Sequence, residues 1–449
     1  MTRRFSPPQI IIASFLCAIG IGAILLSLPI ATQSGERANL IDSIFTATSA
    51  TCVTGLIVRD TGSYFSGFGQ AVILVLLQMG GLGIMTFSTL FAIILGRKIT
   101  LKQDLVIQTT VGHSTVQNLP TLIKYILFVT LGIEITGAVL LAARWMCAYN
   151  WSFSQALMAG FFHSISAFCN AGFSLFSKSF SEYAGDTYIN SVMIALIVLG
   201  GIGFIAVLEI PRFFKKSPAA RVSVQTKLAI TVSIILIILG AIVFFFVEQN
   251  NSIEGLSAKD KIFASLFQSV TARTAGFNTV STASLAMPTL CFFMFLMFVG
   301  ASPGSTGGGI KTCTLGVLVA GTISMLKNRD RVSVFKRTVP KEVVRRAILV
   351  VILAIAWIFI AMFFISIAEY KKAPYVSNYF LKLLFEITSA FGTVGLSTGI
   401  TQSLSVFGKC ILIVTMLVGR IGPLTLVLAV ALRQGKILCK YPEERIMIG

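Results

Sequence analysis

Four glycines recur along the chain at nearly even intervals, at positions 55, 172, 276 and 395, which are 117, 104 and 119 residues apart. Each is the seventh residue of a similar octapeptide, as in SATCVTGL around the first and SAFGTVGL around the last. Glycine adopts left-handed conformations without a Cβ penalty, so successive carbonyls in each loop can turn toward a shared axis. Rings of backbone carbonyls replace the water that a dehydrated cation loses. The pattern therefore predicts a cation site built by four loops.

The side chains in these loops are mostly neutral, and the ring of carboxylates found in many calcium-selective pores is missing from the sequence. Arg273 is the exception, and a guanidinium that faced the axis would repel a cation. We therefore expect Arg273 to point behind its loop and to bond a carboxylate or a carbonyl. The predicted ion-binding residues are Cys52, Val53, Thr54, Gly55, Cys169, Asn170, Ala171, Gly172, Arg273, Thr274, Ala275, Gly276, Gly392, Thr393, Val394 and Gly395.

A second glycine-rich segment, Gly300–Gly309, places five glycines and one proline within an apolar stretch. A continuous helix is not expected there, and irregular backbone at membrane depth is tolerated only beside protein or a watery cavity. We expect this segment below the cation loops, where it would block the ion path and accept hydrogen bonds from Arg420. It is not a phosphate-binding loop, because Ile310 separates the last glycine from Lys311. The predicted gate residues are Gly300, Pro303, Gly304, Gly307, Gly308, Gly309 and Arg420.

These loops need elements that hold them inside a membrane. Hydrophobic residues make up 55% of the 449 and charged residues 12%, which excludes an ordinary soluble protein. A span takes about 20 apolar residues. Short amphipathic stretches, such as residues 39–51 and 377–390, precede the octapeptides and suit re-entrant half-helices with N-caps at Asn39, Ser152, Ser257 and Ser377. Eight predicted spans cover about residues 9–31, 68–96, 120–146, 188–211, 226–248, 285–326, 346–368 and 405–432.

The expected fold is an all-α integral membrane protein with four repeats of span, pore half-helix and span around a pseudo-fourfold pore. The repeats cover residues 9–97, 119–213, 224–326, with the broken gating loop 300–309, and 345–433, and a tail follows at 434–449. Basic residues gather at the N-terminus, in the even-numbered loops and in the tail, which hold 22 of the 36. By the positive-inside rule both termini are then cytoplasmic, and the net charge of +19 reflects topology rather than nucleic-acid binding. The eight cysteines are expected to be reduced packing residues.

With one glycine per filter loop and a broken span in the third repeat, the chain resembles the Trk/Ktr/HKT superfamily of potassium transporters, most closely the bacterial KtrB branch. The resemblance covers nearly the whole chain. It implies potassium uptake across the plasma membrane through a filter of backbone carbonyls, a homodimer of pore subunits, and gating by a cytoplasmic RCK-type nucleotide-binding ring (KtrA-like). In plant relatives a serine at the first filter position goes with sodium permeation, so Gly55 favours potassium.

Several alternatives stay open. Sodium-coupled or sodium-permeable transport is the second reading, with sodium as an activator, because one glycine per loop builds a short filter. No cofactor is expected in this chain, and nucleotide would act only through the partner. An enzyme is not expected, because Cys169 and His163 lack an orienting acid. Glu134 is predicted to be a paired structural carboxylate and Lys311 to reach water or pair with an acid. His163 and His113 are predicted to serve packing or solvation.

Overall fold

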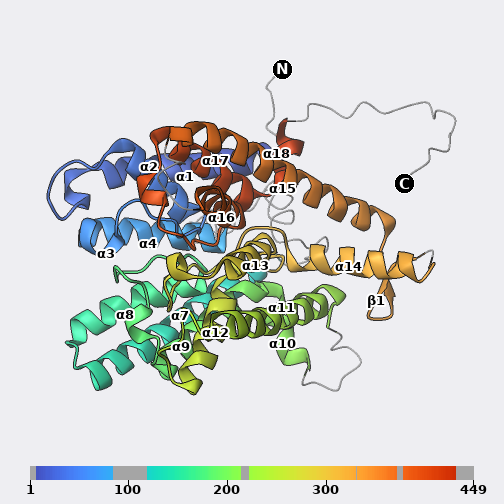
Figure 1. The fold of residues 1–449 in the computed structure, drawn as a ribbon, viewed down its shortest axis with the longest axis horizontal. Helices are drawn as coiled ribbons and strands as arrows, with labels where there is room; N and C mark the ends of the chain where they lie inside the picture. Colours follow the sequence, from blue (N-terminus) through green and yellow to red (C-terminus); the bar gives the residue numbers. More distant parts are fainter. Residues whose placement is uncertain (1–6, 84–118, 214–221, 330, 372–377, 431–449) are drawn as a thin grey trace.

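The computed structural model describes residues 7–83, 119–213, 222–329, 331–371 and 378–430. The described chain is mostly helical, and many helices run roughly along the long axis of the molecule (Figure 1). The elements are α1 (Pro7–Ser27), η1 (Pro29–Ala31), α2 (Leu40–Thr51), α3 (Thr61–Tyr64), α4 (Gly67–Leu82), α7 (Leu119–Tyr149), α8 (Phe153–Phe168), η2 (Ser181–Tyr183), α9 (Thr187–Ile202), α10 (Phe204–Phe213), α11 (Val224–Glu248), α12 (Ala258–Thr271), η3 (Thr282–Ser284), α13 (Met287–Phe298), α14 (Thr312–Leu326), β1 (Ser333–Val334), β2 (Arg337–Thr338), α15 (Lys341–Ala368), α16 (Tyr379–Gly392), η5 (Thr401–Ser403), α17 (Val406–Ile421) and α18 (Pro423–Val430).

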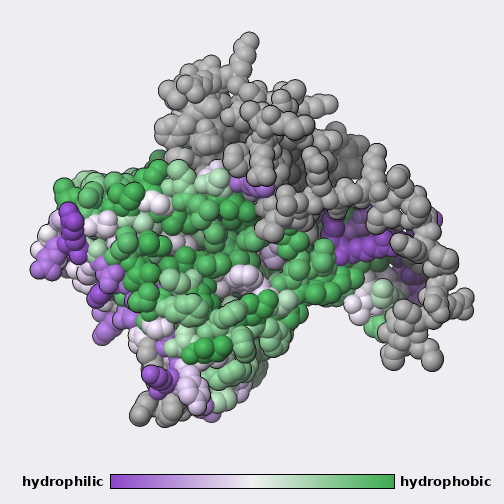
Figure 2. Space-filling model, turned by 90° about the horizontal axis from the view of Figure 1, so that it is seen from above, coloured by the Kyte–Doolittle hydropathy of each residue, from purple (hydrophilic) through white to green (hydrophobic). Residues whose placement is uncertain are grey.

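Four of the described helices, in α1, α7, α11 and α15, are long and apolar enough to cross a membrane by themselves. Large apolar side chains project from them, including Ile24, Phe128 and Phe359, which are 64%, 79% and 71% exposed. Figure 2 shows hydrophobic side chains filling the centre of one face, with hydrophilic ones gathered toward its ends. A face of this kind is suited to lipid, because exposed apolar patches of this extent are rare on soluble monomers. The protein is therefore a multi-pass membrane protein.

The shorter helices α2, α8, α12 and α16 each end at one of the four octapeptides. The predicted caps of the first three are confirmed: Asn39, Ser152 and Ser257 accept hydrogen bonds from backbone N–H groups of the first turn. The fourth predicted cap, Ser377, lies outside the described residues. α16 starts after Asn378, which is left-handed (φ 55°) and makes no capping hydrogen bond with its side chain.

Small residues let these shorter helices lie close against the long ones. Ser164 of α8 donates a hydrogen bond to the Glu134 carbonyl of α7 (2.6 Å), and a Cβ on Gly137 would collide with that serine. Ser269 of α12 makes the same contact with the Ile237 carbonyl of α11 (2.7 Å), beside Gly240. A serine that meets a glycine across a helix pair brings two backbones together without an unpaired hydroxyl.

Two segments predicted as continuous spans are broken in the described part of the chain. The predicted span 188–211 turns by 106° between α9 and α10, at Gly203, and the span predicted at 405–432 is interrupted at Gly422 before Pro423. Both glycines have left-handed φ values, 101° and 91°. The bend after α9 is fixed from outside, because the Phe204 N–H donates to the Gly304 carbonyl (2.9 Å). Histidine 113 and residues 84–96 of the second predicted span lie outside the described residues.

A small antiparallel hairpin joins α14 to α15. Ser333 pairs with Thr338 and Val334 with Arg337, and the two turn residues Phe335 and Lys336 both have positive φ. That conformation matches the right-handed twist of a two-residue hairpin. The hairpin and α3 lie at opposite ends of the molecule (Figure 1).

Candidate ion pathway

The four predicted glycines come together in a closed ring. A Cβ atom added to Gly172 would lie 2.8 Å from the Ala275 carbonyl oxygen and 3.0 Å from the Gly276 Cα. In the same way Gly276 meets Val394 and Gly395, Gly395 meets Thr54 and Gly55, and Gly55 meets Ala171 and Gly172. Each loop thus presses its glycine against the carbonyl that precedes the next glycine. A side chain at any of the four positions would displace a carbonyl of the ring.

The backbone of each loop has the alternating conformation that such a ring needs. The glycines at 55, 172, 276 and 395 have φ values of 90°, 69°, 76° and 91°. The residue two positions earlier is also left-handed in every loop, namely Val53, Asn170, Thr274 and Thr393. Non-glycine residues in this region cost about 1–3 kcal/mol each and persist where the surroundings fix them. Buried hydroxyls do so here: Ser49 accepts from the Gly55 N–H and Ser389 from the Gly395 N–H, each at 3.1 Å.

The ends of four helices favour a cation at this ring. α2, α8, α12 and α16 end three to five residues before its glycines, so each C-terminus is close to the ring. The free carbonyls of a helix C-terminus carry about half a negative charge. Four such ends lower the electrostatic energy of a cation and raise that of an anion.

A cavity of about 840 Å³ lies against the ring and is lined by all four glycines. Its wall is rich in hydroxyl side chains, among them Ser177, Ser281, Thr282 and Thr401. Among the residues that line it, Lys178 is the one charged side chain. Hydroxyls can exchange with the water of an entering ion, so the cavity is suited to be a hydrated entrance.

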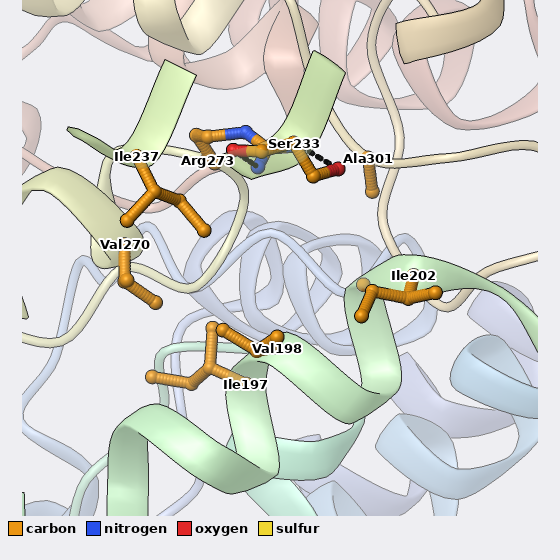
Figure 3. Close-up of a pocket in the computed structure, with 9 residues that line it drawn as sticks. Ile197, Val198, Ile202, Ser233, Ile237, Val270, Arg273 and Ala301 are labelled. Atoms are coloured by element: carbon orange, nitrogen blue, oxygen red, sulfur yellow. Dashed lines mark hydrogen bonds between the residues drawn. The ribbon is translucent and has the colours of Figure 1, made fainter. Parts of the chain in front are cut away.

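Arg273 points behind its loop, as the charge argument predicts. Its guanidinium donates to the Ser233 carbonyl (3.2 Å), the Ser233 hydroxyl (3.1 Å) and the Gly300 carbonyl (3.5 Å). Figure 3 shows it beside Ser233 at the edge of a small pocket with aliphatic walls. The positive charge therefore links the third loop to α11 and to the start of the broken segment.

The broken segment between α13 and α14 lies against the loops of the ring. The Gly308 N–H donates to the Thr393 hydroxyl (3.0 Å), and a Cβ on Gly307 would collide with Thr274. Thr306 bonds the Phe168 and Gly200 carbonyls through its hydroxyl, both at 3.2 Å. The segment thus touches the third and fourth glycine loops and is hydrogen-bonded to the ends of α8 and α9.

Arg420 joins this segment to another part of the chain. One guanidinium nitrogen donates to the Thr306 carbonyl and the other to the Gly80 carbonyl at the end of α4. A planar guanidinium can hold two acceptors in a fixed relation. Its role as part of a gate stays a prediction.

The structure also gives the hydrogen-bond partners of two other charged residues, Lys311 and Glu134. Lys311 does not pair with a described acid, and its ammonium donates to the Gly307 carbonyl (2.6 Å). The glycine-rich turn brings that carbonyl back over the start of α14, which the sequence pattern does not reveal. Glu134 accepts from the Gln78 amide (3.1 Å), and the Cys169 thiol donates to the Gln78 oxygen (3.5 Å). Glu134 is therefore paired, but with an amide.

Sequence reasoning missed a set of polar anchors behind the ring. Glu386 accepts from the Thr398 N–H (2.8 Å) and the Thr401 hydroxyl (2.6 Å), and His163 accepts from the Leu175 N–H (3.2 Å). Both anchors hold the chain three residues after a ring glycine. Their common position, nine residues before Gly172 and Gly395, is a signal that the octapeptide alignment could have revealed.

The helical membrane fold, the ring of carbonyls and the hydroxyl-lined cavity define a cation transport protein. The sequence matches the TrkH family of cation transport proteins over residues 3–440. This chain belongs to that family, which agrees with the expectation of a transporter and not an enzyme.

Similar proteins cover nearly the whole chain. The Ktr system potassium uptake protein B of Bacillus subtilis (strain 168) is 40% identical over 99% of this chain and 97% of its own length. The potassium/sodium uptake protein NtpJ of Enterococcus hirae is 35% identical over 100% and 98%. The crystal structure of the potassium transporter TrkH from Vibrio parahaemolyticus matches the fold with a TM-score of 0.73, at 18% identity, over 96% of this chain and 86% of that one.

Proposed function

We propose that this protein takes up potassium ions across the plasma membrane through a selectivity filter of backbone carbonyls. The observation that carries the proposal is the cyclic contact of the four glycine loops, each with its glycine against a carbonyl of the next. The relatives named as potassium uptake proteins, at 36–40% identity, support the choice of ion. Potassium is the substrate here and not a resident cofactor.

The same contacts favour four repeats around a pseudo-fourfold axis, with the boundaries given above. The order of contacts follows the order of the loops in the sequence and returns to the first, as a ring of four related units requires. The left-handed residue two positions before each ring glycine recurs in all four loops. The filter residues are those named from the sequence, with Cys52 and Cys169 capping the ends of α2 and α8.

We propose that the segment 300–309 is an intramembrane gate which Arg420 holds closed. The hydrogen bond from the Gly308 N–H to Thr393 and the one from Arg420 to the Thr306 carbonyl support this proposal. A positive guanidinium near the ion path also lowers cation occupancy. Opening then needs the loop to leave these partners.

The regulatory partner, the assembly and the orientation are parts of the same proposal. A cytoplasmic RCK-type ring would drive the gate, two copies of this chain would form a homodimer, and both termini would face the cytoplasm. The names of the relatives from the Ktr system support a partnered transporter. Nucleotide would bind the ring and not this chain.

Sodium transport or sodium activation is the second candidate function. The relative from Enterococcus hirae is named a potassium/sodium uptake protein, and this chain matches 98% of that protein's length. Two measurements in the uptake assay below distinguish the candidate functions. Sodium is tested as a competitor of rubidium uptake, and ²²Na⁺ uptake is measured in the absence of potassium, because a sodium-permeable pore would carry it.

Rubidium uptake into a bacterium that lacks potassium transporters tests the proposal. Gly276→Ala should reduce uptake by about tenfold or more, because alanine at a left-handed φ costs about 1–2 kcal/mol and its methyl group would displace the Val394 carbonyl. Gly20→Ala is the matched control, since a Cβ there meets no atom within 4 Å. Equal uptake by both variants at equal membrane levels would contradict a filter at these glycines.

A further inference from the structure

A second cavity, of about 530 Å³, lies at the hairpin end of the molecule, between the end of α14 and the start of α15. Four cationic side chains line it: Arg329, Arg331, Lys341 and Arg345. Its remaining wall is largely apolar and includes Met325, Val332, Val339, Val344 and Ile348. A space with a cationic rim and an apolar wall fits a ligand that has both an anionic and an apolar part.

The positive charge of this cavity is not neutralised within the described part of the chain. None of the four cations forms an ion pair with a described carboxylate. Glu342 stands in the first turn of α15 but does not line the cavity, and Asp330 lies outside the described residues. Four like charges around one space repel one another unless an anion enters it.

Two helix ends of opposite polarity meet at the cavity, the C-terminus of α14 and the N-terminus of α15. No side chain caps the N-terminus of α15, where the N-cap residue Pro340 and the first helical residue Lys341 line the cavity. At the C-terminus of α14 the N–H groups of residues 327, 328 and 329 donate to the carbonyls of Ile323, Met325 and Ser324, and that end keeps the negative partial charge of its helix dipole. The negative end of the α14 dipole offsets part of the positive end of the α15 dipole, so the preference for an anion rests on the four cations.

The apolar wall is continuous with a surface suited to lipid tails. Met325 and Leu326 at the end of α14 are 72% and 82% exposed, and Ile348 of α15 is 42% exposed. Farther along α15, Ile352 and Phe359 are 58% and 71% exposed. A soluble anion would gain nothing from this wall, whereas a molecule with acyl chains would bury it.

From these observations we propose that the cavity binds the headgroup of an anionic diacyl phospholipid. The phosphate lies among Arg331, Lys341 and Arg345, and the acyl chains run along the exposed face of α15. The site holds the hairpin and the start of α15 against the membrane surface. It involves neither the ring of glycines nor the segment below it.

Lipid binding to the purified full-length protein in detergent tests this site without any measurement of transport. Thermal midpoints are recorded while dioleoylphosphatidylglycerol or dioleoylphosphatidylcholine is added, and bound lipid is counted by native mass spectrometry. The variant Arg331→Gln/Arg345→Gln removes two charges from the cavity. Lys336→Gln/Arg337→Gln removes two charges from the hairpin turn, outside the lining residues, and is the matched control.

The wild type and the turn variant should bind phosphatidylglycerol about 25-fold more tightly than phosphatidylcholine, since each of the two cations that the cavity variant removes contributes about fivefold. The cavity variant should lose that preference. Glycerol phosphate alone should not reproduce the stabilisation, because it cannot cover the apolar wall.

The proposal is overturned if both lipids bind the wild type equally, if the turn variant loses the preference as well, or if glycerol phosphate suffices. A cavity variant that keeps the lipid preference but no longer binds an acidic regulatory ring would assign the site to a protein partner instead. If the double variant elutes as an aggregate, Arg345→Gln alone is measured against Arg346→Gln, a neighbour outside the cavity lining, and equal preference in these two overturns the proposal.

Discussion

Removing the guanidinium of Arg420 should open the proposed gate. Arg420 is the residue that joins the broken segment, through the Thr306 carbonyl, to α4, through the Gly80 carbonyl. A hydrogen bond from a charged donor contributes about 1.5–3 kcal/mol. Water in a part-buried site replaces some of this energy, so we take about 2–3 kcal/mol for the pair.

That energy corresponds to about a 30- to 150-fold change in the ratio of open to closed states, since 1.4 kcal/mol is a factor of ten. In Arg420→Ala, basal rubidium flux should therefore rise about 30-fold, or to the level of the fully activated wild type if that is reached first. The segment keeps its other bonds, including Gly308 to Thr393, so it loosens without leaving its place.

Arg420→Lys separates the two effects of this residue. Lysine keeps the positive charge, but its compact ammonium does not bridge two carbonyls as a planar guanidinium does. If the bridge holds the gate, flux in Arg420→Lys should rise about tenfold. If only the charge mattered, this variant would match the wild type.

The flux is measured in proteoliposomes with and without the regulatory ring, and it is normalised to the amount of protein inserted. Deleting residues 304–309 should raise basal flux in the same way and reduce dependence on the ring. Flux at or below the wild-type level in both Arg420→Ala and the deletion, with intact protein, would show that the segment supports the pore and does not close it.

Three further changes test other parts of the pathway. Gly55→Ser should weaken potassium selectivity over sodium, because a hydroxyl would displace the Ala171 carbonyl of the neighbouring loop; unchanged relative permeability in vesicles would place the filter elsewhere. Lys178→Gln should raise rubidium uptake about twofold at low ionic strength and less at high salt, since it removes the one charge lining the entrance cavity, and a salt-independent effect would count against this reading. Reversing Lys336 and Arg337 to glutamate should weaken co-purification with an acidic ring protein, more so at low salt; intact binding would exclude the hairpin turn as the contact.

Low pH should weaken the ion pair between Arg144 of α7 and Asp186, the N-cap residue of α9. Burial alone would raise the pKa of Asp186, but the Ile189 N–H and the Arg144 guanidinium (2.9 Å) outweigh it and lower that pKa. A lowered pKa means that the stabilisation is complete above about pH 4, the ordinary value for aspartate, and is lost as pH falls through the folded pKa. The difference in thermal midpoint between the wild type and Asp186→Asn should therefore shrink below pH 4, and a constant difference would contradict it.

The periodic features of this chain could be predicted from sequence because they depend on local chemistry. A glycine at the same register of each octapeptide, and a serine or asparagine before a half-helix, indicate the same backbone wherever they occur. The position of Arg273 behind its loop could be predicted from charge. The bend at Gly203 could not be predicted with them, because it depends on a hydrogen bond to Gly304, about a hundred residues away.

The partners of buried polar groups were the least predictable part. Lys311 has a carbonyl within reach only because the glycine-rich turn folds back, and Glu386 receives four hydrogen bonds only because the chain after Gly395 returns over α16. Composition and periodicity do not reveal long-range geometry of this kind. The shared spacing of His163 and Glu386, each nine residues before a ring glycine, is the one sequence feature here that indicates it.

Anomalous diffraction from crystals grown in rubidium is the most direct test of the ring. The account predicts a rubidium peak on the axis between Gly55, Gly172, Gly276 and Gly395, surrounded by the carbonyls that precede them, and loss of that peak in Gly276→Ala. A peak elsewhere in the membrane region with none at the ring would contradict it.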